Sequence, residues 1–255
     1  MKVTLSPKDI HYGSLIAVNG EHGLPQDHSC SLFHVDESSG VTMQRNAAVL
    51  LGKLLEAAGG REIALVSGYR SAEEQRRIWY DSLRENGREF TEKYVAAPFH
   101  SEHQTGLAID LGLKRGHIDF IRPNFPYDGI CGEFRRRAAD YGFVERYPAG
   151  KEKITGIAHE PWHFRYVGVP HAAIMNAKDF TLEEYVLWLK KFKFGQSPLI
   201  FRRESLRAEI SFLEAQQAEL ELNEPYSVSG NNSDGFIITQ ITPERGRGYE
   251  TIRHA

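Results

Sequence analysis

The chain has 255 residues, of which 41% are apolar and 25% are charged. These proportions are close to those of average globular proteins and exclude a disordered or fibrous chain. With 31 basic and 34 acidic side chains the net charge is −3, so there is no strong basic field to attract nucleic acid or an anionic membrane. The 2 cysteines, Cys30 and Cys131, are too few for a disulfide scaffold and suit a reducing compartment.

The N-terminal segment does not follow the pattern of a secretory signal. Such a signal needs a basic start, an apolar run of about 7–15 residues and a small-residue cleavage site, and Asp9 and His11 interrupt any such run. The sequence also lacks a stretch of about 18 apolar residues, so no transmembrane helix or membrane anchor is expected. We therefore expect a cytoplasmic protein.

Apolar spacing predicts helices and strands in the first part of the chain. A helix is expected over residues 42–58, because apolar side chains recur there at helical spacing and a glycine pair follows. Residues 63–66 predict a short buried strand. Ser71 and Glu74 have the spacing of a capping box, which predicts a helix that ends before Gly87.

Further strands are expected over residues 106–113 and 157–167, and further helices over residues 133–141 and 182–193. The strands do not alternate strictly with helices, as they would in a parallel βαβ protein. The pattern therefore predicts the α+β class, with a central antiparallel sheet and flanking helices.

The last part of the chain has a different character. Residues 203–222 predict an amphipathic helix, because one stripe of this segment is apolar: Leu206, Ile210, Leu213 and Leu220. Two short strands are expected on either side of residues 230–235, which are rich in turn-forming residues. We therefore expect a main domain over residues 1–195. Residues 196–255 would add a helix and a short hairpin, either as an appended unit or as an extension of the core.

Asp110 is the clearest chemical signal, because it lies between Ile109 and Leu111 in an otherwise apolar strand. A buried carboxylate must be paired with a positive charge or coordinate a metal. An ion pair with arginine or lysine is the simpler alternative. However, the sequence also contains His103 and His163, and two histidines with one carboxylate form a common catalytic zinc set.

The segment from His159 to His163 formally matches the zinc motif H-E-x-x-H. In that motif a helix places both histidines on one face. Here Pro161 would lie inside the helix, where it removes a hydrogen bond and clashes with the preceding turn. We therefore expect His163 to be a metal ligand and His159 to lie in the pocket wall or behind the ligands.

Two further side chains suit hydrolysis at such a metal. Glu160 lies three residues before a ligand and could act as the base that accepts a proton from water; the alternative is a surface glutamate. Arg70 follows a buried strand and precedes a capped helix, in a type of loop that commonly carries function. Its guanidinium could stabilise an oxyanion, or it could form an ordinary salt bridge.

Three motifs occur together in order: S-G-Y-R-S at residues 67–71, S-x-H-x-x-G-x-A-x-D at residues 101–110 and E-P-W-H-F-R-Y-V-G at residues 160–168. Together they resemble the LAS-type zinc peptidases, a group that includes the VanY and VanX D-alanyl-D-alanine peptidases and the hedgehog signalling domain. The resemblance covers residues 15–168 and is strongest to the VanXY type of vancomycin-resistance enzyme. It implies the LAS fold, with a zinc D,D-peptidase domain over residues 1–195.

The resemblance also implies roles for individual residues. One zinc ion per chain would be held by His103, Asp110 and His163. Glu160 would be the catalytic base, and Arg70 would polarise the scissile carbonyl group. Two more positions match residues that face the terminal carboxylate of the peptide in such enzymes: Ser101 and Gln75.

The implied reaction is hydrolysis of D-alanyl-D-alanine bonds, in the free dipeptide, at the end of peptidoglycan pentapeptide precursors, or in both. Three alternatives stay open: an L,D-carboxypeptidase with the same metal, a cell-wall endopeptidase, and a non-catalytic zinc-binding module. The presence of both Glu160 and Arg70 argues against the last, because a structural metal site needs neither. The expected partners are small peptides ending in D-Ala-D-Ala, and the oligomeric state stays open.

Overall fold

The computed structural model describes residues 1–203, 206–243 and 251–253. The chain divides into two compact units. One is Val18–Thr181, and the other combines Met1–Ala17 with Leu182–Ala255. The sequence places the boundary after residue 195 and leaves the N-terminal residues in the main domain, whereas the structure assigns them to the C-terminal unit. Within the described ranges there is no helix long and apolar enough to cross a membrane.

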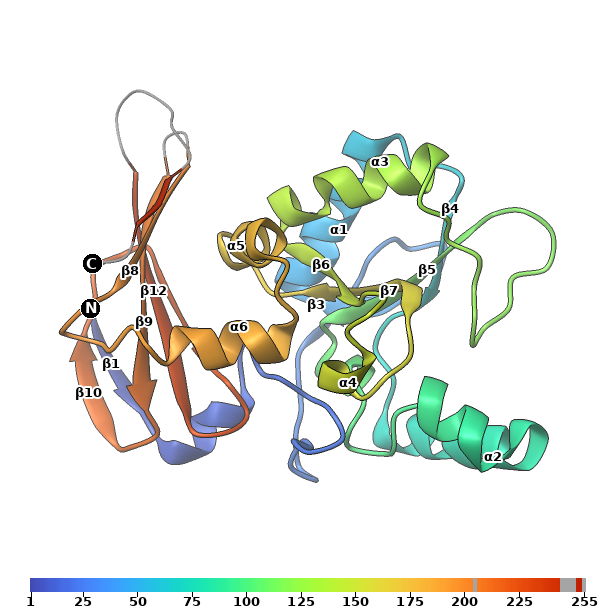
Figure 1. Cartoon of the computed structure of the whole chain (residues 1–255), viewed down its shortest axis with the longest axis horizontal. Helices are drawn as coiled ribbons and strands as arrows, with labels where there is room; N and C mark the ends of the chain where they lie inside the picture. The colour runs from blue at the N-terminus through green and yellow to red at the C-terminus, as the bar shows by residue number, and fades with distance from the viewer. Residues whose placement is uncertain (204–205, 244–250, 254–255) are drawn as a thin grey trace. The chain divides into compact units, whose positions relative to one another are not determined.

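A four-stranded sheet lies at the centre of the Val18–Thr181 unit (Figure 1). All neighbouring strands in it are antiparallel, which confirms the predicted α+β fold. Its strands, in spatial order, are β4 (Ile63–Ser67), β5 (Ala108–Leu113), β7 (Glu160–Tyr166) and β6 (Phe143–Tyr147).

Helices α1 (Arg45–Ala58) and α3 (Gly129–Ala138) cover one face of this sheet (Figure 1). They share a hydrophobic core with alternate strand residues, among them Ile109 of β5 and Phe164 of β7. Successive side chains of a strand point to opposite faces. The neighbouring Asp110 and His163 therefore point away from this core, to the face where the functional site forms.

The remaining elements of this unit surround the sheet. Helix α2 (Ala72–Tyr94) begins with the predicted capping box, in which the Ser71 side chain accepts a hydrogen bond from the backbone of Glu74. Helix α2 is interrupted at Gly87, where the predicted helix was expected to end: its φ of 80° and ψ of 171° are not helical, and two helical runs meet there at a kink. The shorter elements are β2 (Leu32–His34), β3 (Thr42–Gln44), α4 (Glu152–Thr155) and α5 (His171–Lys178).

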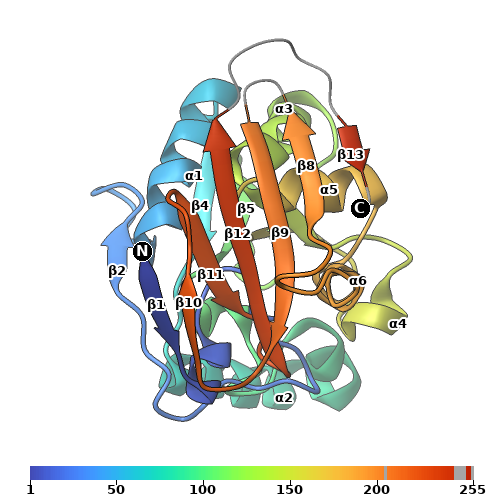
Figure 2. The same cartoon turned by 90° about the vertical axis from the view of Figure 1, so that its left-hand side faces the viewer.

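The second unit is built mainly of antiparallel strands, which are prominent in Figure 2. Five of them form one sheet in the order β11 (Tyr226–Gly230), β12 (Gly235–Pro243), β9 (Leu206–Glu214), β8 (Leu199–Arg203) and β13 (Thr251–Arg253). The predicted hairpin is confirmed as the β11–β12 pair. The unit also contains the pair β1 (Lys2–Leu5) and β10 (Ala218–Glu221), and helix α6 (Leu182–Leu189).

The helix predicted over residues 203–222 is wrong, because β9 and β10 occupy most of this segment. The buried residues of β9 include Ala208, Ile210 and Phe212, which alternate as they do in a strand. Strand β9 pairs with β12 on one side and β8 on the other. These pairings satisfy its backbone and override a leucine spacing that also fits a helix.

Candidate metal and catalytic site

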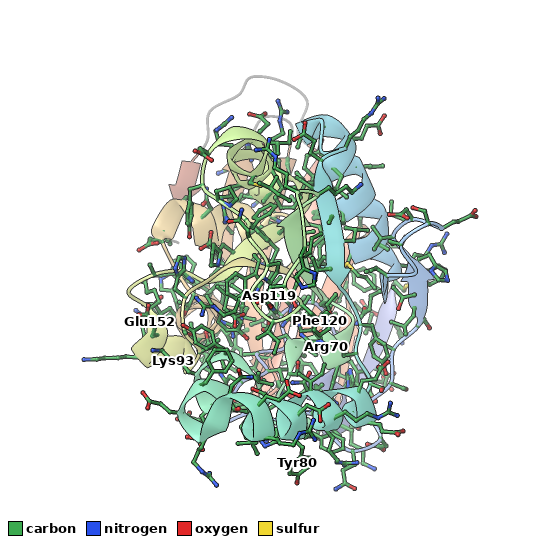
Figure 3. All side chains as sticks on the ribbon, turned by 90° about the vertical axis from the view of Figure 1, so that its right-hand side faces the viewer. Arg70, Tyr80, Lys93, Asp119, Phe120 and Glu152 are labelled. Carbon is green, nitrogen blue, oxygen red and sulfur yellow. The ribbon has the colours of Figure 1, made fainter. Side chains whose placement is uncertain are left out.

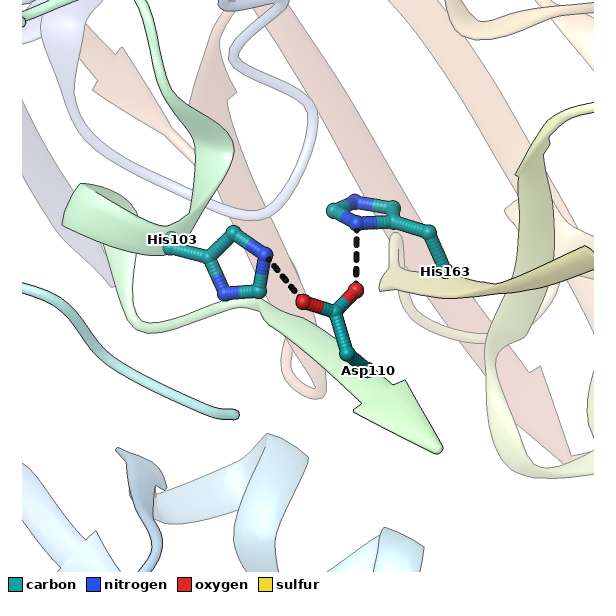
Figure 4. A group of neighbouring side chains, drawn as sticks. All are labelled: His103, Asp110 and His163. Atoms are coloured by element: carbon teal, nitrogen blue, oxygen red, sulfur yellow. Dashed lines mark hydrogen bonds and ion pairs between the residues drawn. The ribbon is translucent and has the colours of Figure 1, made fainter. Parts of the chain in front are cut away.

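Strand register brings the first two candidate ligands together. Asp110 of β5 and His163 of β7 are directly opposite each other in the antiparallel pair. Side chains in such positions have Cβ atoms about 4.5–5.5 Å apart. The Nδ1 atom of His163 lies 2.9 Å from Oδ1 of Asp110 (Figure 4).

His103 completes the group from a 3-10 helix (Glu102–Thr105) that precedes β5. Its Nδ1 donates a hydrogen bond to the carbonyl oxygen of Gly68, 2.6 Å away, which leaves Nε2 as the free electron-pair donor. Nε2 lies 3.1 Å from Oδ2 of Asp110, but the angles are not those of a hydrogen bond, and Nε2 has no other hydrogen-bond partner among the described residues. Burial and the nearby Arg70 lower the pKa of His103 to about 4, so this imidazole is neutral.

These three side chains have the arrangement of a metal site. One ligand atom from each of His103, Asp110 and His163 lies within 4.8 Å of the other two, and all three residues are buried. Two imidazoles and a carboxylate match the ligand chemistry of a catalytic zinc site, which keeps its remaining position open. The buried and unpaired Nε2 of His103 also fits a metal, because an isolated buried polar atom is otherwise costly. The residues present can therefore hold a metal ion.

A strand irregularity brings Glu160 to the same site. Glu160 and His163 are three residues apart in β7, and in a regular strand they would point to opposite faces of the sheet. The strand is not regular here, because the pairing of β6 with β7 shifts register between Glu145 and Tyr147. Such irregularities redirect side chains next to active sites. Oε2 of Glu160 lies 3.8 Å from Nδ1 of His163. Burial raises the pKa of Glu160 to about 8, which makes its carboxylate a stronger base than a solvated one.

Arg70 reaches the site from the loop between β4 and α2. Its backbone N–H donates to the carbonyl oxygen of His103 at 3.2 Å, and its guanidinium Nη2 lies 3.4 Å from Oδ2 of Asp110. Burial lowers the pKa of Arg70, while the charges of Asp110 and Glu160 oppose that change. An arginine side chain stays charged in proteins, so Arg70 places a positive charge beside the candidate metal site.

One pocket contains every site residue predicted from the sequence. Ser101 and Gln75 line it together with the candidate ligands, Glu160 and Arg70. The Nε2 of Gln75 donates to the carbonyl oxygen of Ala96 at 2.7 Å, whereas its buried Oε1 has no hydrogen-bond partner among the described residues. Phe120 also lines this pocket; it is labelled with Arg70 in Figure 3.

His159 does not join the candidate ligands. Its Nε2 lies 2.7 Å from the hydroxyl group of Tyr127 and 3.5 Å from Oε1 of Glu145. The H-E-x-x-H spacing occurs here at the start of a strand and not on a helix, so the geometry that makes this motif a zinc site is absent from this segment.

One buried acidic residue at the site has no role in the sequence-based prediction. Glu102 lies next to His103, and its Oε2 lies 3.5 Å from Nε2 of His163. Its Oε1 accepts hydrogen bonds from Arg146 at 2.8 Å and Arg165 at 2.6 Å. Burial opposes ionisation of Glu102, but these two arginines hold the pKa of its carboxyl group well below the usual value. The sequence does contain one signal of a buried acidic partner: Arg146 and Arg165 each lie in a largely apolar strand, β6 and β7.

The comparison with protein families identifies the class. The model of the VanY family, described as D-alanyl-D-alanine carboxypeptidase, matches residues 40–169. The chain belongs to this family and is an enzyme, which confirms the resemblance noted in the sequence.

Individual relatives are similar over much of their length. The chain is 48% identical to the bifunctional D-Ala-D-Ala dipeptidase and D-Ala-D-Ala carboxypeptidase VanXYC of Enterococcus gallinarum, over 57% of this chain and 77% of the relative. It is 30% identical to a D-alanyl-D-alanine carboxypeptidase of Enterococcus faecium, over 92% of this chain and 78% of the relative.

Solved structures give the same family assignment. The vancomycin-resistance D,D-dipeptidase VanXYg, in complex with a D-Ala-D-Ala phosphinate analog, matches with a TM-score of 0.91 and 46% identity. That match covers 95% of this chain and 99% of the other. A variant of the D,D-pentapeptidase VanY from the VanB-type resistance cassette, in complex with Zn(II), matches with a TM-score of 0.56 and 30% identity, over 68% of this chain and 98% of the other.

Proposed function

We propose that this enzyme is a zinc-dependent D,D-peptidase that hydrolyses D-alanyl-D-alanine bonds and confers vancomycin resistance. Its substrates would be the free dipeptide, peptidoglycan precursors that end in D-Ala-D-Ala, or both. The cytoplasmic location predicted from the sequence is part of this proposal. The observation that carries it is the convergence of a buried His–Asp–His group with Glu160 and Arg70 in one pocket of a VanY-family chain.

His103, Asp110 and His163 would hold one zinc ion per chain. When bound, zinc supplies Lewis-acid chemistry that activates water and polarises a carbonyl group. The protein fixes the ligands through the cross-strand pairing of Asp110 with His163 and through the hydrogen bond from His103 to Gly68. Ligand orientation of this kind is a main contribution of a protein to its metal site.

Glu160 would act as general base and then as general acid. Its carboxylate accepts the proton of the attacking water and returns that proton to the departing amino group of the C-terminal D-alanine. The position of Glu160 beside His163 supports this role, because proton transfer requires the base to be within reach of the reacting water.

Arg70 would stabilise the negative charge that develops on the oxygen of the scissile carbonyl group. A fixed positive charge next to the developing charge is effective because no reorganisation is needed during the reaction. Ser101 and Gln75 would bind the terminal carboxylate of the peptide, as the family resemblance implies. The hydroxyl group of Ser101 can donate a hydrogen bond to a carboxylate, and the amide nitrogen of Gln75 has a second N–H besides the one that it donates to Ala96.

The test is the release of D-alanine by purified, zinc-loaded protein. Free D-Ala-D-Ala and a muramyl pentapeptide ending in D-Ala-D-Ala are supplied separately, each with and without a chelator. Chelator-sensitive release from both substrates is expected for a combined dipeptidase and carboxypeptidase. Release from the pentapeptide alone would restrict the activity to a carboxypeptidase. If neither substrate is cleaved while zinc stays bound, the proposed activity is wrong, and a tetrapeptide with an L,D bond becomes the next substrate to test.

A further inference from the structure

A fully buried group of charges lies next to His163. It consists of Glu102, Arg146 and Arg165, whose side chains each have 0% exposed area. Burying three charges is expensive and often contributes little net stability. The contact of this group with His163 therefore points to a function other than stability.

The two oxygens of Glu102 have different partners. Oε1 accepts hydrogen bonds from both arginines, at 2.8 Å from Nε of Arg146 and 2.6 Å from Nη1 of Arg165. Oε2 is directed to the ring of His163, 3.5 Å from its Nε2. The arginines thus fix the carboxylate, and the carboxylate faces one particular nitrogen of a candidate ligand.

The two histidines of the site are oriented through opposite ring nitrogens. His103 donates from Nδ1 to the Gly68 carbonyl oxygen and directs Nε2 toward Asp110. His163 presents Nδ1 to Asp110, so its Nε2 is the nitrogen available to donate to Glu102. The partner of the non-ligating nitrogen decides which nitrogen carries the proton and which can bind a metal.

We propose that Glu102 is the positioning residue of His163: its carboxylate, clamped by Arg146 and Arg165, holds the proton on Nε2 and directs Nδ1 to the metal. This inference rests on the metal site of the proposed function and goes beyond it, because it assigns a role to a residue outside the ligands and the catalytic pair. The ring of Tyr147, whose centroid lies 4.9 Å from that of His163, packs against the same imidazole and further restricts its orientation.

The unmodified protein provides the first test. Nitrogen NMR of the zinc-loaded protein with ¹⁵N-labelled histidine reports the protonated nitrogen of each buried ring. We expect His103 to carry its proton on Nδ1 and His163 on Nε2. If His163 carries its proton on Nδ1 while zinc is bound, the proposal is overturned, and this result does not depend on any variant folding.

The second test uses Glu102→Gln, which keeps the size of the side chain but removes its charge. We expect the affinity for zinc, measured by competition with a chelator, to fall about 10- to 100-fold, as is usual when a residue that orients a metal ligand is changed. The His163 Nε2–H resonance should shift, while that of the His103 Nδ1–H should not. Unchanged zinc affinity with an unchanged His163 resonance would overturn the proposal.

Glu102→Asp distinguishes two roles of Glu102: orientation of His163, and neutralisation of the two buried arginines. It restores a negative charge for the two arginines but withdraws the carboxylate from His163 by one methylene group. We expect it to recover thermal stability relative to Glu102→Gln while zinc affinity stays low; recovery of both together would show that Glu102 only neutralises the arginines.

A matched control for lost stability is Thr91→Val, which removes the hydroxyl group that hydrogen-bonds to Ser82 and to the carbonyl oxygen of Gly87 elsewhere in the unit. We expect this variant to lose thermal stability but not zinc affinity. All these readouts are independent of peptide hydrolysis. If the unmodified protein bound no zinc, the metal site of the proposed function would fail, whereas normal zinc binding with unaffected Glu102 variants would refute only the role of Glu102.

Discussion

Asp110 and His163 face each other across β5 and β7, so the register of one strand pair sets the distance between two candidate metal ligands. A slip of one residue would turn one of these side chains to the opposite face of the sheet. The hydrophobic residues that alternate with them, such as Ile109 and Phe164, would then lose their places in the core. Packing on one face of the sheet therefore secures the chemistry on the other.

Removal of a candidate ligand should remove the metal. We expect His103→Ala to lower bound zinc well below one ion per chain, because the two remaining ligands offer too few donors for a stable site. Metal analysis after dialysis measures this stoichiometry. His159→Ala is the matched control and should keep its zinc, since His159 contacts Tyr127 and Glu145 instead. If His159→Ala loses its zinc while His103→Ala keeps it, the H-E-x-x-H motif and not His103 supplies the ligands.

Replacement of the proposed base should separate metal binding from turnover. We expect Glu160→Gln to keep zinc but to lower kcat by about 10²- to 10⁴-fold, the usual contribution of a general acid–base group. Steady-state release of D-alanine from D-Ala-D-Ala measures the loss. Glu62→Gln, which changes an exposed ion pair with Arg115, serves as the control. Full activity of the Glu160 variant would rule out its assignment as the base.

Arg135 should maintain the strand irregularity that directs Glu160. Its Nη2 donates to the carbonyl oxygens of Pro161 at 2.5 Å and Phe125 at 2.8 Å, and Nη1 pairs with Glu145. Lysine cannot reproduce this set of directed bonds. We expect Arg135→Lys to lower kcat by up to about 100-fold, because small displacements of catalytic groups are costly, and to leave zinc affinity unchanged.

The control for this change lies on the same helix. Arg137 makes an exposed ion pair with Glu133, and such pairs contribute little. Arg137→Lys should therefore have close to normal kcat. Equal effects of the two substitutions would show that Arg135 has no special influence on Glu160.

His171 should make the stability of the fold sensitive to acid. Burial lowers its pKa from 6.5 to about 3, so the folded protein holds the imidazole neutral while the unfolded chain can bind a proton. The folded-state pKa is depressed, and protonation below pH 6.5 therefore favours unfolding. The stabilisation is complete above that pH and declines as the pH falls toward 3.

The measurement compares urea unfolding of the metal-free protein with that of metal-free His171→Gln. The free energy of unfolding of the unmodified protein should fall more steeply below pH 6.5, by up to about 1.4 kcal/mol per pH unit relative to the variant. Parallel pH profiles for the two proteins would contradict this account.

Local patterns in the sequence were sufficient for much of the fold. The apolar spacing of α1 and the capping box at Ser71 depend on neighbouring residues, and both appear in the structure. Strand β9 was missed because its apolar residues also fit a helical spacing, and only pairing with β8 and β12 decides between the two. The apolar spacing of one segment carries no information about the strands with which that segment will pair.

The same distinction separates the parts of the site that were predicted from those that were not. The motifs gave the residues that the pocket brings together, because their chemical types and spacing are visible in the sequence. The role of Glu102 depends on contacts with Arg146, Arg165 and His163, which are 44, 63 and 61 positions away in the chain. The register shift that redirects Glu160 likewise exists only in the assembled sheet.

The pairing of β1 with β10 has a consequence for the order of folding during synthesis. Val3 lies opposite Leu220, so strand β1 has to wait for a partner that is translated only after the whole of Val18–Thr181. The unit that carries the candidate site contains all four strands of its own sheet and can form in the meantime. The unit that contains β1 is therefore the last to be completed, and a chain that ends near residue 181 would contain β1 without its partner.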